Sequence, residues 1–157
     1  MAYQEPFLRE AIRLAKAHME AGDGGPFGAV VAKDGAIVGR GWNRVATSND
    51  PTAHAEVMAI RDACARLETF SLAGCEIYAS CEPCPMCLAA IYWARLDALY
   101  FAGSRNDAAD AGFDDALLYE ELSKDRGARK LIAEQHLQAG AQAVFNRWKN
   151  KPDRIDY

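Results

Sequence analysis

The sequence lacks any apolar run that approaches the roughly 20 residues a membrane-spanning helix requires. It also lacks the basic start and the apolar segment of a secretory signal peptide. A cytoplasmic protein without membrane contact is therefore the expectation. The 157 residues, 50% of them hydrophobic, suffice for one domain with a buried core, and no repeat or linker divides them.

Positive charge is also scarce. The 18 Lys and Arg residues against 22 Asp and Glu residues give a net charge of −4 at neutral pH. A protein that holds a nucleic-acid backbone usually carries a basic surface. Basic residues gather here only locally, at 126–130 and 147–151, which is typical of solvated surface. The expected partner is a small, uncharged substrate and not a nucleic acid.

Cysteines are few and odd in number: the chain has five, and three of them are Cys81, Cys84 and Cys87. Such a cluster is a poor disulfide framework, and in a cytoplasmic chain it is more often a metal site. Cys64 and Cys75 fall within a helix pattern and a strand pattern, so we expect both to pack in the core. The remaining cluster of Cys81, Cys84 and Cys87 therefore indicates a metal site.

Hydrophobic periodicity predicts an alternation of helices and strands. An Asp-Gly pair at 34–35 marks a hairpin between the first two strands. Strands that alternate with helices imply an α/β sandwich whose later strands are parallel. Residues 130–138 fit either a strand or an extended arm. The expected helices are 6–21, 54–68, 85–95 and 139–149, and the expected strands are 27–33, 36–42, 76–80 and 96–102.

A candidate metal site combines His54 with Cys84 and Cys87. The two cysteines are three residues apart at a predicted helix start, beside Pro83 and Pro85, so they share one face of the first turn. The positive end of the helix dipole there favours the thiolate form that binds zinc. Three protein ligands leave one tetrahedral position open for water, which is the arrangement of a catalytic zinc site. One Zn²⁺ per chain is expected.

Glu56 is a spare carboxylate two residues after His54. Residues i and i+2 of a regular helix point to opposite faces, so both reach one metal only if His54 lies in an irregular first turn. In that case Glu56 can take a proton from a zinc-activated water and pass it to a substrate. The alternative is an exposed helix carboxylate.

Cys81 leaves a second alternative open. A third thiolate would close the zinc shell and make the site structural. Glu82 precedes Pro83 and is therefore held in extended geometry, which makes it less natural for Cys81 to point with the helix-borne pair. We expect Cys81 to be a packed thiol that does not bind the metal.

The pattern H-x-E…P-C-x-x-C is the signature of zinc deaminases that act on nucleobases. Five stretches extend it, and together they resemble the small bacterial guanine deaminases of the cytidine deaminase superfamily over nearly the whole chain. These stretches are residues 24–30, 47–56, 80–87, 91–95 and 110–115.

The resemblance implies a cytidine deaminase-like fold, a three-layer α-β-α sandwich around a mixed sheet of about five strands. It implies a single zinc deaminase domain over 1–157, in a homodimer that exchanges C-terminal segments of about 130–157. The implied reaction converts guanine to xanthine and ammonia by attack of a zinc-activated water on C2. The stretch 127–141 departs from the family, being charged and alanine-rich without a clear strand, which leaves the fifth strand open.

The resemblance also assigns roles by position. It makes His54, Cys84 and Cys87 the zinc ligands and Glu56 the proton shuttle. Five further residues would contact the substrate. Asn43 would hydrogen-bond the base, Phe27 would stack on the purine and Trp93 would line the pocket, whereas the structural alternatives are a turn cap for Asn43 and a place in the core for the two aromatic residues. Asp115 would accept the N–H donors of the base and move a proton to the leaving amine, and Tyr157 would cap the partner's site.

Several alternatives remain at this point. Asp114 competes with Asp115 as the acid that faces the substrate. The same frame serves guanosine, ammeline or another aminopurine. A tRNA adenosine deaminase fits the acidic chain less well, and a non-catalytic zinc module would require Cys81 as fourth ligand.

Overall fold

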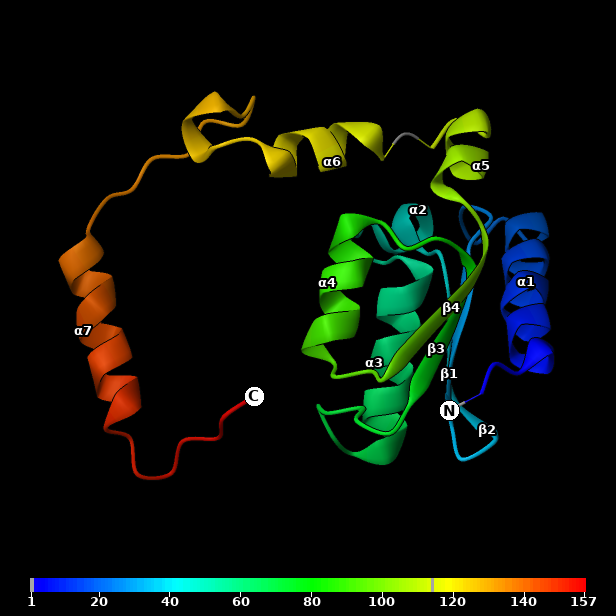
Figure 1. Ribbon diagram of the computed structural model, residues 1–157, viewed down its shortest axis with the longest axis horizontal. Helices are drawn as coiled ribbons and strands as arrows, with labels where there is room; N and C mark the ends of the chain where they lie inside the picture. Colours follow the sequence, from blue (N-terminus) through cyan, green and yellow to red (C-terminus); the bar gives the residue numbers. More distant parts are fainter. Residues whose placement is uncertain (1, 114) are drawn as a thin grey trace. The chain divides into compact units, whose positions relative to one another are not determined.

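The structure is a computed structural model that describes residues 2–113 and 115–157. The chain divides into two compact units, Met1–Asp115 and Ala116–Tyr157, each considered by itself below. The first unit contains, in chain order (Figure 1), α1 (Glu5–Glu20), β1 (Gly28–Lys33), β2 (Ala36–Trp42), α2 (Val45–Ser48), α3 (Ala55–Leu67), β3 (Glu76–Cys81), α4 (Pro85–Trp93), β4 (Ala98–Gly103) and α5 (Arg105–Asp110).

The first unit is built on a mixed sheet with the strand order β2-β1-β3-β4. β1 is antiparallel to both of its neighbours, whereas β3 and β4 are parallel, as expected. The described residues form four strands and not about five. Residues 128–137 contain a single β-branched residue, Ile132, among charged side chains, and such a composition disfavours a strand.

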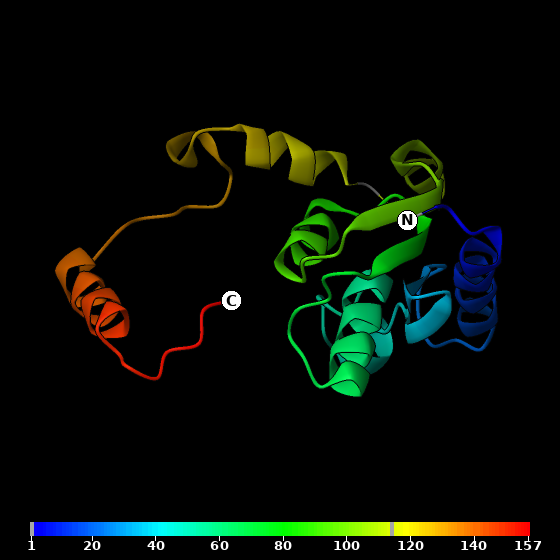
Figure 2. The same ribbon diagram turned by 60° about the horizontal axis from the view of Figure 1, so that its bottom comes forward.

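Helices cover both faces of this sheet, which confirms the predicted three-layer sandwich. Successive side chains of a strand point to opposite faces, and β1 uses this alternation. Ala29 and Val31 pack in a cluster with α3 and α4, while Val30 and Ala32 pack with α1. Figures 1 and 2 show α1 on one side of the sheet and α3 and α4 on the other.

Helix α3 lies unusually close to the edge strand β2. A Cβ atom on Gly41 would collide with the backbone of Ala55 and Ala59, and one on Gly39 would collide with Ala59 and Ala63. Glycine at both positions therefore lets the start of α3 approach the end of β2. The ends of β2 and β3, the start of β1 and the first turns of α3 and α4 consequently surround one crevice, where ligands of open α/β sheets commonly bind.

The second unit consists of α6 (Ala116–Ser123), a 3-10 turn at Arg126–Ala128 and α7 (Gln138–Lys149). The helix predicted over 139–149 is confirmed, and residues 132–137 before it form neither helix nor strand. Helices α2, α5 and α6 were not expected. No described residue of this unit is buried. None of the helices in the described part of the chain combines the length and apolar character needed to cross a membrane.

Glu10 of α1 makes a stabilising contact between α1 and β2 with a defined pH dependence. Its carboxylate accepts bonds from Arg13 at 2.6 Å and Arg40 at 3.0 Å, and the Arg13 bond foremost lowers its pKa to about 2. Because the Arg13 side chain is 61% exposed and that of Arg40 is 40% exposed, we expect Glu10→Gln to lower the unfolding free energy by only about 1 kcal/mol near neutral pH.

This loss should shrink as the pH falls from the ordinary carboxyl value towards about 2, since protonation of the unfolded chain then removes the advantage of the wild type. Urea unfolding of both proteins at about pH 7 and about pH 4 measures the difference. A gap that widens on acidification would contradict the assignment.

Candidate active site

Three side chains meet at the starts of α3 and α4. His54 is the residue before the first turn of α3, and Cys84 holds the same position in α4. Their ligand atoms and that of Cys87 all lie within 4.8 Å of one another. His54 Nδ1 lies 3.6 Å from Cys84 Sγ and 3.5 Å from Cys87 Sγ. Tetrahedral zinc with ordinary Zn–S and Zn–N bonds separates such atoms by about 3.6 Å, so the donor set fits zinc in geometry and chemistry.

The two thiols of this set are electrostatically coupled. The Cys87 thiol donates to the Cys84 sulfur, and together with His54 it lowers the pKa of Cys84 to about 4. The pKa of Cys87 is raised in turn by that neighbouring thiolate and by burial. The bond to Cys84 also raises the pKa of His54. The cluster thus holds one thiolate, that of Cys84, and a divalent cation can replace the proton that Cys87 shares with it.

Cys81 lies outside this set among the residues that the structure describes. It ends β3, and its Sγ lies 3.5 Å from the carbonyl oxygen of Ser104. Its thiol donates to Ser104 and it stands apart from the three donors, in agreement with the expectation that Cys81 does not bind the metal. The set of three ligands therefore retains an open fourth position.

Glu56 occupies the first turn of α3 beside the three donors but is not one of them. Only 7% of its surface is exposed, and burial raises its pKa. The extended backbone of His54, with φ −73° and ψ 156°, removes the difficulty of the i, i+2 spacing because His54 precedes the regular helix. A buried carboxylate with a raised pKa is suited to accepting and returning a proton.

A cavity of about 360 Å³ opens onto this cluster. It is bounded by the start of β1, the end of β2, the first turns of α3 and α4, and the segment after β4. The predicted site residues that line it are Phe27, Asn43, His54, Glu56, Cys84 and Asp115. Asp114 lies outside the described residues.

Asn43 is both a turn cap and a cavity residue. Its Oδ1 accepts the backbone N–H groups of Gly25 and Val45, each at 3.2 Å. Because the carbonyl oxygen is engaged by the backbone, the orientation of the amide is fixed. The turn-cap role of Asn43 is therefore observed, and a bond from its NH₂ group to a substrate stays a prediction.

Phe113 is a lining residue to which the sequence gave no individual role. Its ring meets that of Phe27 edge to face, with centroids 4.8 Å apart. The cavity is also lined by Gly25, Val45, Ala46, Cys81, Glu82 and Ala108. The one available signal for Phe113 was an aromatic residue directly before two acids in a polar loop.

Trp93 and Tyr157 are not among the residues that line this cavity. Trp93 ends α4, is 63% exposed and lies beneath the Arg95 guanidinium at 5.8 Å. It follows Cys87 by six residues, or about 9 Å along the helix axis, too far to share the ligands' end of α4. Tyr157 belongs to the second unit and is 74% exposed.

An open three-ligand metal site with a spare buried carboxylate, set at the edge of an α-β-α sandwich, defines a zinc-dependent hydrolase that works on water and a small substrate. The chain belongs to the family described as the cytidine and deoxycytidylate deaminase zinc-binding region, whose model matches residues 1–103.

Two guanine deaminase comparisons extend over almost the whole chain. Guanine deaminase of Bacillus subtilis (strain 168) is 50% identical over 153 residues, 98% of this chain and 98% of that protein. An X-ray structure of guanine deaminase from Bacillus subtilis matches with a TM-score of 0.96 at 49% identity, over 99% of each chain. A tRNA-specific adenosine deaminase of Aquifex aeolicus is 44% identical over 99 residues, 63% of this chain and 65% of that protein.

Proposed function

We propose that this protein is a zinc-dependent aminohydrolase that converts guanine to xanthine and ammonia. The observation that carries the proposal is Glu56, a carboxylate 7% exposed that lines the same cavity as His54 and Cys84 yet lies outside the donor set. The guanine deaminase relative matches 98% of the chain, whereas the tRNA deaminase relative matches 63%. The greater coverage supports a free purine as the substrate.

In this proposal His54, Cys84 and Cys87 hold one zinc ion. When bound, zinc supplies Lewis acidity that lowers the pKa of a coordinated water towards neutrality. Thiolate and imidazole ligands favour zinc over hard cations such as magnesium or calcium. The mutual distances of the three donor atoms, all within 4.8 Å of one another, support the assignment.

Glu56 moves the protons of the reaction. The overall change replaces the amino group on C2 of guanine by oxygen from water, and the amino group leaves as ammonia. Glu56 accepts a proton from the attacking water and returns it to the substrate. Burial raises its pKa, which makes the carboxylate a better proton acceptor than an exposed one.

The other lining residues orient guanine. The base presents a ring N–H and an amino group next to C2, and the Asp115 carboxylate can accept from both and assist the leaving amine. The fixed amide of Asn43 donates to an acceptor of the base. The Phe27 ring provides a stacking surface in the same cavity.

We further propose a homodimer in which C-terminal segments of about 130–157 are exchanged. The second unit carries large apolar side chains with no buried residue among those described, including Ile132, Val144 and Phe145, each at least 65% exposed. A partner subunit of the same chain would cover them. In the dimer, Tyr157 of one subunit would cap the substrate pocket of the other.

Removal of residues 155–157 tests the role of the tail. We expect the KM for guanine to rise about tenfold while the zinc content stays unchanged, since Tyr157 lies far in sequence from every metal donor. Steady-state kinetics and metal analysis of the zinc-loaded full-length and shortened proteins measure both. Unchanged kinetics would contradict a capping role for Tyr157.

A substrate panel on zinc-loaded protein tests the proposed function. Guanine should give the highest kcat/KM, above guanosine, ammeline, other aminopurines and tRNA, as measured by ammonia release. A higher kcat/KM for any other member would replace guanine as the substrate.

A further inference from the structure

Helix α5 lacks the buried side chains that anchor α1, α3 and α4 in the first unit. None of its residues, Arg105–Asp110, is buried. The chain that follows it nevertheless contributes Phe113 and Asp115 to the cavity. Gly112 turns this chain with a φ of +94°, and the Phe113 N–H donates to the carbonyl of Ala108 at 2.9 Å. The position of α5 therefore determines the position of Phe113.

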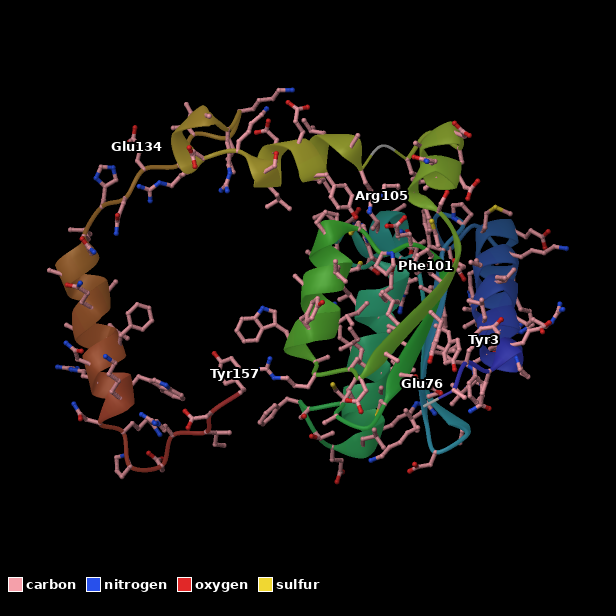
Figure 3. The ribbon with its side chains drawn as sticks, in the orientation of Figure 1. Tyr3, Glu76, Phe101, Arg105, Glu134 and Tyr157 are labelled. Carbon is pink, nitrogen blue, oxygen red and sulfur yellow. The ribbon has the colours of Figure 1, made fainter. Side chains whose placement is uncertain are left out.

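An ion pair ties α5 to the end of β3. Both oxygens of Glu82 are used. Oε1 accepts Nε and Nη2 of Arg105 at 3.1 and 2.6 Å, and Oε2 accepts the backbone N–H of Arg105 at 3.0 Å. The Glu82 N–H donates to the carbonyl of Gly103 at 2.7 Å. Figure 3 labels Arg105 at the start of α5. Such a two-pronged contact fixes orientation as well as distance.

Three further contacts of this segment fix its position less firmly. The capping box of Ser104 and Asp107 is internal to the segment and shapes α5 without attaching it to the sheet. The Cys81 thiol reaches the Ser104 carbonyl at 3.5 Å, which is a weak bond. The edge-to-face contact of Phe113 with Phe27 attaches only the far end.

We propose that Glu82 and Arg105 are positioning residues for the substrate: their ion pair fixes α5, and through it holds Phe113 and Asp115 at the cavity. The inference rests on the proposed function, since it assigns Asp115 to the substrate. Glu82 lines the cavity, but its oxygens are directed to Arg105 and do not need to contact the purine.

Arg105→Met is the principal test, because it keeps the length of the side chain and removes the bidentate contact. In zinc-loaded full-length protein we expect the kcat/KM for guanine to fall about tenfold, mainly through KM, with the zinc content unchanged. Hydrogen exchange of the peptide 105–115 should accelerate. Glu82→Gln should act in the same direction with a smaller effect, because an amide oxygen can still accept the Arg105 N–H.

A matched control is Arg66→Met, which breaks the comparable exposed ion pair of Arg66 with Asp62, 3.0 Å long, on α3. It should leave kcat/KM within about twofold of the wild type. In an Asp115→Asn background, Arg105→Met should cost less than about threefold, since the residue it positions has already lost its carboxylate. An undiminished tenfold loss there, or an Arg105→Met protein with wild-type kcat/KM, would overturn the inference.

Failure of the proposed function has a different signature. A zinc-loaded wild-type protein that does not turn over guanine refutes guanine deamination whatever the variants do. The exchange measurement still decides the anchoring in that case, and unchanged exchange of 105–115 in Arg105→Met would refute it.

Discussion

A Glu56→Gln protein is expected to retain about one zinc ion per chain and to lose about 1,000-fold in kcat on guanine. Glutamine has nearly the same shape as glutamate, so the buried first turn of α3 should keep its packing. The amide cannot accept the proton that the carboxylate takes from water. Loss of the proton shuttle without loss of the metal separates the chemical role of Glu56 from a structural one.

Metal analysis and steady-state kinetics on the same preparation check this result. Glu10→Gln is a matched control, because it neutralises a carboxylate of α1 that pairs with Arg13 and Arg40 and does not line the cavity. It should keep wild-type kcat. A Glu56→Gln protein with full zinc and full turnover is incompatible with the mechanism.

Cys87→Ser is expected to lose zinc, whereas Cys81→Ser is expected to keep it. Cys87 Sγ is fully buried and lies 3.5 Å from His54 Nδ1, within the donor set. A serine hydroxyl is a far weaker zinc ligand than a thiolate, so the metal content should fall at least tenfold and guanine turnover should fall with it, by about 100-fold or more. Cys81 is directed to Ser104 and contributes no ligand.

Metal content and thermal unfolding of both variants distinguish an open site from a closed one. If Cys81→Ser lost zinc and unfolded as well, Cys81 would be the fourth ligand and the site would be structural. That outcome would restore the alternative of a non-catalytic zinc module.

The sequence was most informative where the determinants are local. The hairpin at Asp34-Gly35 and the buried strands are confirmed, because turn geometry and apolar alternation specify them. The approach of His54, Cys84 and Cys87 could be expected because two helix starts place their first residues at one end of a sheet. Their spacing alone indicated metal chemistry.

The sequence was less informative where tertiary contacts decide. Helix α5 has a loop-like composition, and its Ser104–Asp107 capping box became evident only with the helix in place. The fifth strand left open by the sequence does not form in the described residues, because 128–137 lacks a strand-like composition. Phe113 reaches the cavity because Gly112 turns the chain with a positive φ and because Arg105 pairs with Glu82, 23 residues earlier in the sequence. No local sequence pattern encodes this combination.

The most direct test of the account is the fate of guanine incubated with zinc-loaded wild-type protein in heavy-oxygen water. Hydrolytic attack on C2 predicts xanthine that carries one heavy oxygen at C2, with one ammonia released for each xanthine formed. Mass spectrometry of the product and an ammonia assay give both quantities. Protein with one zinc per chain that forms no xanthine from guanine, or forms xanthine without the label, would contradict the account.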